Sequence, residues 1–153
     1  MKTFLIITIL LTLFNACSSN NAFSEFHITE AQEKSEDSIL SSKIYDANRV
    51  IGVVSAVYLN RIFPEKYHDF DVFYVYLYTK EKGTQLSFIL NKIQAKEVQH
   101  LEAKNQFSDL IPYTGDWQNY YLVKFTKKED KILRLRVKTK NSSSELMLFH
   151  REI

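Results

Sequence analysis

Between residues 50 and 151, apolar side chains recur mostly at every second position, the period that is typical of β-strands. Residues 131–139 show the clearest alternation, because Leu133, Leu135 and Val137 fall on the face opposite to a row of mainly charged residues. Short polar turns separate the runs, and in one of them Gly83 supplies a residue that accepts a positive φ. The pattern predicts six strands, at residues 50–63, 71–79, 84–91, 117–126, 131–139 and 144–151.

Residues 94–110 interrupt this alternation. The segment is rich in Gln, Glu, Lys and Ala, and Val98, Leu101 and Leu110 lie near one face of a helix built from it. It therefore predicts an amphipathic helix of about four turns. The predicted order is βββ-α-βββ, an antiparallel, β-rich α+β domain. A small curled barrel and an open sheet with one helix both fit that order.

The first residues have the pattern of a signal peptide. One lysine precedes residues 4–14, an apolar run interrupted only by Thr8 and Thr12. As a helix this run would be roughly 16 Å long, about half the thickness of a bilayer's hydrocarbon core. The length is too short for a spanning helix and suits a signal-peptide core, so residues 1–16 are predicted to be a signal peptide.

The sequence Leu-Phe-Asn-Ala-Cys at residues 13–17 resembles the lipobox of bacterial lipoproteins. Ala16 fits the small position before the cysteine, whereas Phe14 and Asn15 differ from the commonest residues of the pattern. The resemblance implies that Cys17 carries a diacylglyceryl group and palmitate, and that the membrane is a partner through this lipid. Because Ser18 and not aspartate follows, it also implies the outer membrane, facing the periplasm. The alternatives are an ordinary secretory signal with a coincidental cysteine, or a buried apolar start.

Residues 17–43 are rich in serine and acidic residues and show little apolar periodicity. Such a composition is typical of chains that cannot bury enough surface to offset their entropy. We therefore expect a lipidated N-terminus and flexible tether at 17–43, followed by a single domain at 44–153. Within the tether, residues 29–32 have the form of a capping box, which could start a short helix.

Composition mainly excludes functions. The chain has 153 residues, a formal net charge of +2, one cysteine and three glycines. A single cysteine excludes an internal disulfide framework and a cysteine-only zinc site. With so few glycines there is no phosphate-cradling motif, and the near-neutral charge argues against a nucleic-acid partner. No cofactor is expected.

The strongest local charge lies in residues 124–140, which hold eight basic residues against Glu129 and Asp130. Because Arg134, Arg136 and Lys138 alternate along one predicted strand, they share a face. They are a candidate patch for an anion, such as a lipopolysaccharide phosphate, an anionic phospholipid or an acidic partner. The alternative is a solvated sheet face that discourages edge pairing.

The strand at residues 71–79 has no polar face, since tyrosines alternate with Phe73, Val75 and Leu77. Such a strand is usually buried on both faces. The tyrosines could instead form a binding surface, because a phenol ring buries area and keeps a polar end. The residues of this candidate surface are Tyr58, Tyr74, Tyr76, Tyr78 and Tyr120.

Catalytic patterns are absent from the sequence, and the only local cluster of metal-ligand types is His68, Asp69 and Asp71. The alternative for this cluster is a polar loop with its charges in water. Two hypotheses remain. The first is a non-catalytic, lipid-anchored envelope module that binds a protein, lipid or glycan; the second is a small envelope enzyme, such as a metal-dependent hydrolase using the His68 loop.

Overall fold

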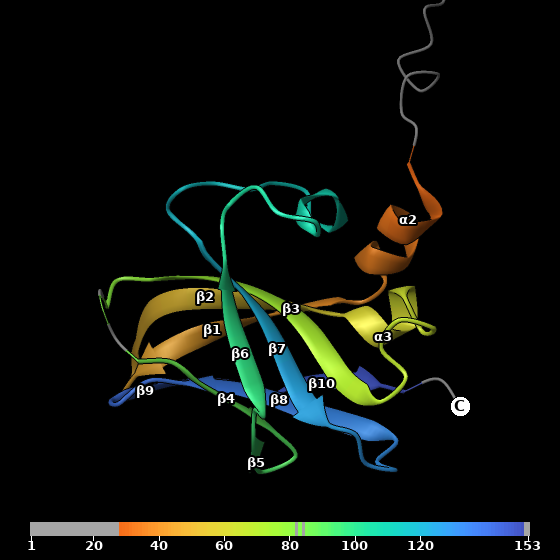
Figure 1. Ribbon diagram of the computed structural model, residues 1–153. Coiled ribbons are helices and arrows are strands. Elements are labelled where there is room, and N and C mark those ends of the chain that lie inside the picture. Colours follow the sequence, from red (N-terminus) through yellow and green to blue (C-terminus); the bar gives the residue numbers. More distant parts are fainter. Residues whose placement is uncertain (1–27, 82, 84, 152–153) are drawn as a thin grey trace, which may run out of the picture.

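The computed structural model describes residues 28–81, 83 and 85–151, which form an α+β fold dominated by one antiparallel sheet (Figure 1). The sheet is strongly curled into a half-barrel, with short helical segments packed on one side of it. The predicted signal peptide and Cys17 lie outside the described residues. The fold class expected from the alternation is confirmed.

Helical segments in the described residues are few and short. They are α2 (Glu30–Glu36), α3 (Leu59–Ile62) and the 3₁₀ segment η3 (Ser108–Leu110). The strands are β1 (Ile39–Asp46), β2 (Arg49–Tyr58), β3 (Phe70–Thr79), β4 (Ser87–Leu90), β5 (Ile93–Gln94), β6 (Glu97–Leu101), β7 (Asn119–Thr126), β8 (Ile132–Lys138), β9 (Ser142–Ser144) and β10 (Met147–His150).

The strands follow the order β5-β4-β8-β9-β1-β2-β3-β7-β6, and β10 also pairs with β8. The chain between β5 and β6 connects the two ends of this order. The Ala95 amide donates to the Phe88 carbonyl, on β4, at 3.0 Å. The next amide, that of Lys96, donates to the Lys124 carbonyl, on β7, at 2.8 Å. These two bonds connect β4, near one end of the strand order, with β7, near the other end, as the curl of the sheet allows.

Strand β3 separates two cores. Phe73, Val75 and Leu77 point into the half-barrel, where they meet residues of β2, β7, β8 and β10. Val72 and Tyr74 point outward into a second cluster, which α3 and the segment around η3 cover. The division of β3 into these two faces is the one that the sequence predicts, and both faces are buried along residues 72–75, whereas Tyr78 is 40% exposed.

The helix predicted at residues 94–110 is wrong. This segment forms β5, the edge strand β6 and η3. Its apolar stripe is thin, and Val98 remains 45% exposed even in the folded chain. Pairing with β7 gives the backbone hydrogen bonds that a helix would have given, and it sets Glu97 opposite Lys124 with a 3.0 Å ion pair. Tertiary pairing therefore overrides the helical composition.

The predicted tether at 17–43 is also too long, because the folded part begins well before residue 44. Thr29 caps α2 through the expected capping box with Gln32. Strand β1 then starts at Ile39, and its serines do not weaken it because neighbouring strands satisfy them. One example is Ser41, whose hydroxyl lies 2.7 Å from that of Ser55 on β2. Serine-rich composition thus conceals a strand that lies inside the sheet.

The pairing of the strands differs from that of the simple meander that the sequence suggests. Strands β2 and β3 pair as expected, but β4 pairs with β8, and β7 pairs with β3 and β6. Residues 59–62 of the first predicted strand form the helical turn α3 instead. Because the sheet curls, segments that follow one another in the chain can lie on opposite walls of the half-barrel. This arrangement brings the turn after β4 beside β8.

Candidate functional site

The outer face of β8 carries the predicted basic row, Arg134, Arg136 and Lys138. Along β8, buried and more accessible positions alternate without a break. Leu133, Leu135 and Val137 are each at most 1% exposed and fill the half-barrel. The alternation therefore places the three cations on the opposite face, where Arg134 is exposed and Arg136 and Lys138 are partly exposed.

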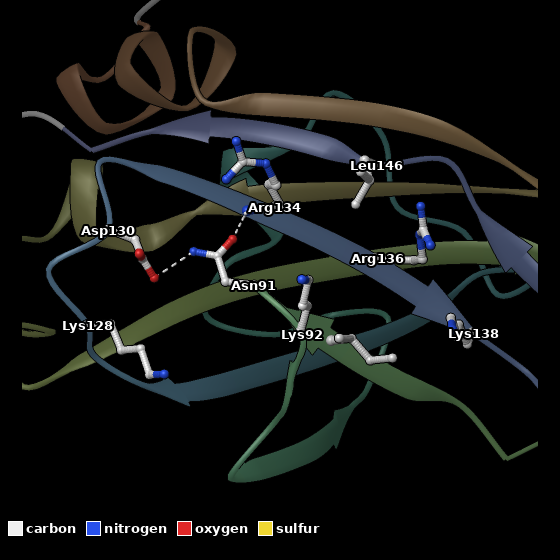
Figure 2. A pocket seen from close by; sticks show the side chains of 9 residues that line it. Asn91, Lys92, Lys128, Asp130, Arg134, Arg136, Lys138 and Leu146 are labelled. Atoms are coloured by element: carbon white, nitrogen blue, oxygen red, sulfur yellow. Dashed lines mark hydrogen bonds between the residues drawn. The ribbon is translucent and has the colours of Figure 1, made fainter.

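A two-residue turn between β4 and β5 closes one side of this face. Asn91 and Lys92 both have positive φ, 46° and 71°, as a tight hairpin turn requires. The Asn91 side chain accepts from the Arg134 amide at 2.8 Å and donates to Asp130 at 2.9 Å and to the Ile132 carbonyl at 3.1 Å (Figure 2). Asn91 thereby clamps the turn onto β8 and holds Lys92 beside the basic row.

Together these elements enclose a hollow of about 810 Å³, here called the basic groove. Figure 2 shows its side chains arranged around β8 and the Asn91 turn. Five of the lining side chains are cationic, and Asp130, already bound by Asn91, is the one carboxylate. The lining residues are Ile89, Asn91, Lys92, Lys128, Asp130, Arg134, Arg136, Lys138 and Leu146.

The described part of the chain does not neutralise the cations of the basic groove. Among the described residues, none of the five has a carboxylate within salt-bridge distance. The Arg136 Nε atom is buried and has no hydrogen-bond partner in the described part of the chain. A buried donor without an acceptor costs about 1–3 kcal/mol. An anion that binds Arg136 in the groove would contact the part of its guanidinium that stays accessible, since the side chain as a whole is only partly buried.

Three of the five tyrosines of the candidate binding surface are buried and so cannot form a surface. Tyr58, Tyr74 and Tyr120 are 4%, 0% and 1% exposed and belong to the two cores. Tyr76 is half-buried beside Tyr74, and Tyr78 alone is well exposed. Burial raises the pKa of Tyr74 to about 12, as expected for a phenol in apolar surroundings. Core packing therefore explains most of the aromatic character of β3.

The structure separates the proposed metal ligands. His68 and Asp69 are exposed and lie 3.3 Å apart, from Nε2 to Oδ2. Asp71 belongs to β3, as the strand predicted at residues 71–79 requires, and is 1% exposed, so it is not part of a polar loop with its charges in water. No group of three or more histidine, cysteine or acidic residues in the described part of the chain is placed to hold a metal ion. The polar-loop interpretation suits His68 and Asp69.

Asp71 has a structural partner that the sequence does not suggest. Arg151 Nη2 donates to both carboxylate oxygens of Asp71, at 2.6 and 2.7 Å. The hydroxyl of Tyr58 donates to Oδ1 of the same carboxylate at 2.8 Å. Burial, together with the charge of Asp71, raises the pKa of Tyr58. This network of three residues ties the end of the chain to β2 and β3.

Sequence reasoning identified the basic row but not the rest of the basic groove. Lys128 and Asp130 lie in the basic stretch and follow β7, whereas Asn91 and Lys92 come from a distant turn. The only signal for that turn is the pair Asn91-Lys92 between two short apolar runs, since asparagine tolerates positive φ. Which strand the turn lies against depends on the β4–β8 pairing.

No protein family model matches this chain, and neither does any curated protein or solved structure. Within the described residues, none of the helices combines the length and the apolar character needed to cross a membrane.

Proposed function

We propose that this protein is a lipid-anchored, non-catalytic binding module of the bacterial envelope, and that its basic groove holds a ligand with several phosphate or carboxylate groups. The single observation that carries the ligand class is the basic groove itself. Five cations converge on one hollow in which the only carboxylate is already hydrogen-bonded by Asn91. A concave site with one sign of charge concentrates counter-ions of the opposite sign.

The spacing of the cations favours a ligand with more than one anionic group. Residues two apart on a strand are separated by about 6.6–6.8 Å, so Arg134 and Lys138 lie roughly 13 Å apart. A single phosphate would contact both only if the two long side chains bent toward each other. A chain or cluster of anionic groups can meet the whole row, and Lys92 and Lys128 would contact it from the sides. Phosphate-bearing glycans and acidic peptides have this form.

The anchoring part of the proposal rests on the leader. The apolar run at residues 4–14 and the lone cysteine at position 17 support attachment of a diacylglyceryl group and palmitate to Cys17. Two or more acyl chains make a stable anchor, whereas one chain gives only marginal binding. The outer membrane, with the domain in the periplasm, is the location proposed from Ser18.

Calorimetric titration with inorganic tripolyphosphate tests the groove. We expect binding that weakens as salt is raised, because charge attraction supplies most of it. The Arg136→Gln variant should bind roughly tenfold more weakly, since it loses a charge-assisted hydrogen bond. A parallel titration with a hexaglutamate peptide distinguishes a phosphate ligand from a carboxylate ligand.

Lys131→Gln is the matched control. It removes the same charge from the same basic segment, one residue before β8, but Lys131 is exposed and does not line the basic groove. We expect its affinity to stay within about twofold of the original protein. Equal losses in the two variants would mean that only the overall charge matters, and the groove would not be a site.

The anchor has a separate test. In cells that express the Cys17→Ala variant, the protein should not incorporate labelled palmitate. It should also be lost from the membrane fraction. Palmitate labelling that persists in this variant would disprove attachment at Cys17.

A further inference from the structure

A cluster of exposed aromatic rings lies away from the basic groove. Tyr78, Tyr113 and Trp117 are 40%, 64% and 55% exposed. The rings of Tyr113 and Trp117 stack with their centroids 6.4 Å apart, and the ring of Tyr78 meets that of Trp117 edge-on at 5.7 Å. These three residues are here called the aromatic platform. Large exposed rings in contact with one another are typical of binding surfaces.

The platform is held in place by the backbone beneath it. A Cβ atom at Gly115 would lie 2.5 Å from Trp117 Nε1 and 2.9 Å from a ring carbon of Tyr113, so only glycine allows both rings to close over this position. The buried hydroxyl of Tyr120 accepts from the Gly115 amide at 2.7 Å and lies 2.7 Å from Gln118 Oε1. The rings are therefore pre-organised, which lowers the entropic cost of binding a ligand.

A polar hollow of about 600 Å³ adjoins the platform and shares Tyr113 with it. Its polar wall combines carboxylate, amide, hydroxyl and ammonium groups, and a residue of α2 contributes to it. The residues that matter for recognition are Gln32, Lys104, Asp109, Tyr113, Thr114 and Asp116. A flat apolar ring beside several hydrogen-bonding groups is the combination that small-molecule sites use to fix an amphipathic ligand.

We infer that the platform and this hollow form a binding site for an uncharged, hydroxyl-rich glycan. A sugar ring has one face of C–H groups, which suits the electron-rich face of an aromatic ring, and hydroxyls at its edge. Asp109 and Asp116 supply acceptors for those hydroxyls, and Gln32 supplies a donor and an acceptor. One ring can stack on Tyr113 or Trp117 while its edge reaches the hollow.

Charge argues against other occupants of this site. Residues 28–37 and 102–118, which surround it, carry seven carboxylates and only two lysines. An anionic ligand or an anionic membrane surface would be repelled, so this site and the basic groove select different ligands. Figure 1 shows α2 and the segment leading into β7 on the opposite side of the molecule from β8. The inference does not depend on the basic groove or on the lipid anchor.

Trp117 is the only tryptophan of the chain, so its fluorescence reports on this site directly. We would titrate the chain from Cys17 onward, which contains every described element, with tetramers of glucose, galactose, mannose and N-acetylglucosamine. At least one tetramer should change the emission of Trp117 with a dissociation constant on the order of 0.1–1 mM. Because the ligand is uncharged, raising the salt concentration should leave this affinity unchanged.

Two variants locate the effect. Tyr113→Ala should weaken binding roughly tenfold, because a stacking ring is lost from a residue that is exposed and not needed for the core. Leu148→Ala is the control, since Leu148 is 48% exposed on β10 and distant from the platform in the strand order. It should leave the affinity unchanged. Circular dichroism of both variants checks that the fold persists.

Three results would overturn the inference. The first is no response of Trp117 to any of the four tetramers. The second is an equal loss of affinity in Tyr113→Ala and Leu148→Ala. The third is a blue shift of the emission on adding phosphatidylcholine vesicles without any response to the sugars, which would identify the platform as a membrane contact. None of these results bears on tripolyphosphate binding, so the two sites can fail separately.

Discussion

Strands β3 and β8 belong to the same sheet and both turn apolar side chains into the half-barrel, yet their outer faces meet opposite surroundings. On β3, the outward residues Val72 and Tyr74 are fully buried under α3 and the segment around η3. On β8, the outward residues Arg134 and Arg136 line an open groove. Although both strands belong to one sheet, the outer face of β3 is apolar and is covered by other segments, whereas the outer face of β8 is charged and stays open.

The charged residues of the two strands also differ in whether the protein supplies them with partners. Asp71 on β3 is the one buried charged residue of the described chain, and Arg151 and Tyr58 satisfy both of its oxygens. The cations of β8 have no such partner among the described residues. A buried charge must be compensated by other groups of the protein, whereas water, solvent ions or a ligand can compensate a charge in an open groove. Charge on β3 therefore serves stability, whereas the charges on β8 have no partner in the described chain and stay available to a ligand.

The largest effect should follow from breaking the compensated charge. In the Asp71→Ala variant, Arg151 and Tyr58 keep their burial but lose their acceptor. Removing one partner of a buried ion pair typically costs about 3–5 kcal/mol, so the free energy of unfolding in urea should fall by roughly that amount. The measurement is the midpoint of unfolding followed by circular dichroism.

Asp69→Ala is the control for that experiment, because Asp69 lies two residues away and its side chain is 72% exposed. Its unfolding free energy should stay within about 0.5 kcal/mol of the original protein. If both variants lose the same small amount, the Asp71 network does not stabilise the fold, and the distinction between the charges of β3 and β8 fails.

A second, smaller effect should appear at alkaline pH. Burial raises the pKa of Tyr74 to about 12, from roughly 10 for an unfolded chain. The folded state therefore holds this proton more tightly, and the contribution to stability is complete below pH 10 and is lost as pH rises toward 12. The loss should be on the order of 2 kcal/mol. Urea unfolding at several pH values measures it.

Tyr74→Phe tests the source of that pH dependence. Phenylalanine keeps the ring in the outer core but has no proton to lose, so the decline between pH 10 and 12 should become shallower. Burial also raises the pKa of Tyr58 and Tyr76, and their contributions should persist in this variant. An unchanged slope would show that the phenol of Tyr74 ionises as easily in the folded protein as in the unfolded chain.

Prediction from the sequence succeeded for features that depend on a single strand, such as which side chains share a face. Alternation along residues 131–139 is enough to place the basic row on the outer face of β8, and the two apolar faces of residues 71–79 are enough to indicate burial on both sides. These inferences need only the period of two. They do not depend on which strands are neighbours.

Prediction failed where the outcome depends on contacts between distant segments. Residues 97–101 form an edge strand because β7 is available to pair with them, and nothing within the segment itself specifies that partner. Likewise, Asp71 looks like a loop carboxylate until Arg151, eighty residues later, is placed beside it. The basic groove needs Lys92 from the β4–β5 turn, which only the β4–β8 pairing brings to β8. Such pairings arise from the curl of the sheet.

The smallest effect on stability should come from Arg136→Gln, and this makes it the sharpest test of the difference between β3 and β8. Arg136 has no acceptor for its buried Nε among the described residues and lies among four other cations, so the folded protein gains little from its charge. The free energy of unfolding should stay within about 0.5 kcal/mol, or rise as repulsion is relieved. Urea unfolding without added anions measures this value. A loss of more than about 1 kcal/mol would mean that Arg136 stabilises the fold as Asp71 does, and weaker tripolyphosphate binding in this variant would then no longer identify a ligand contact.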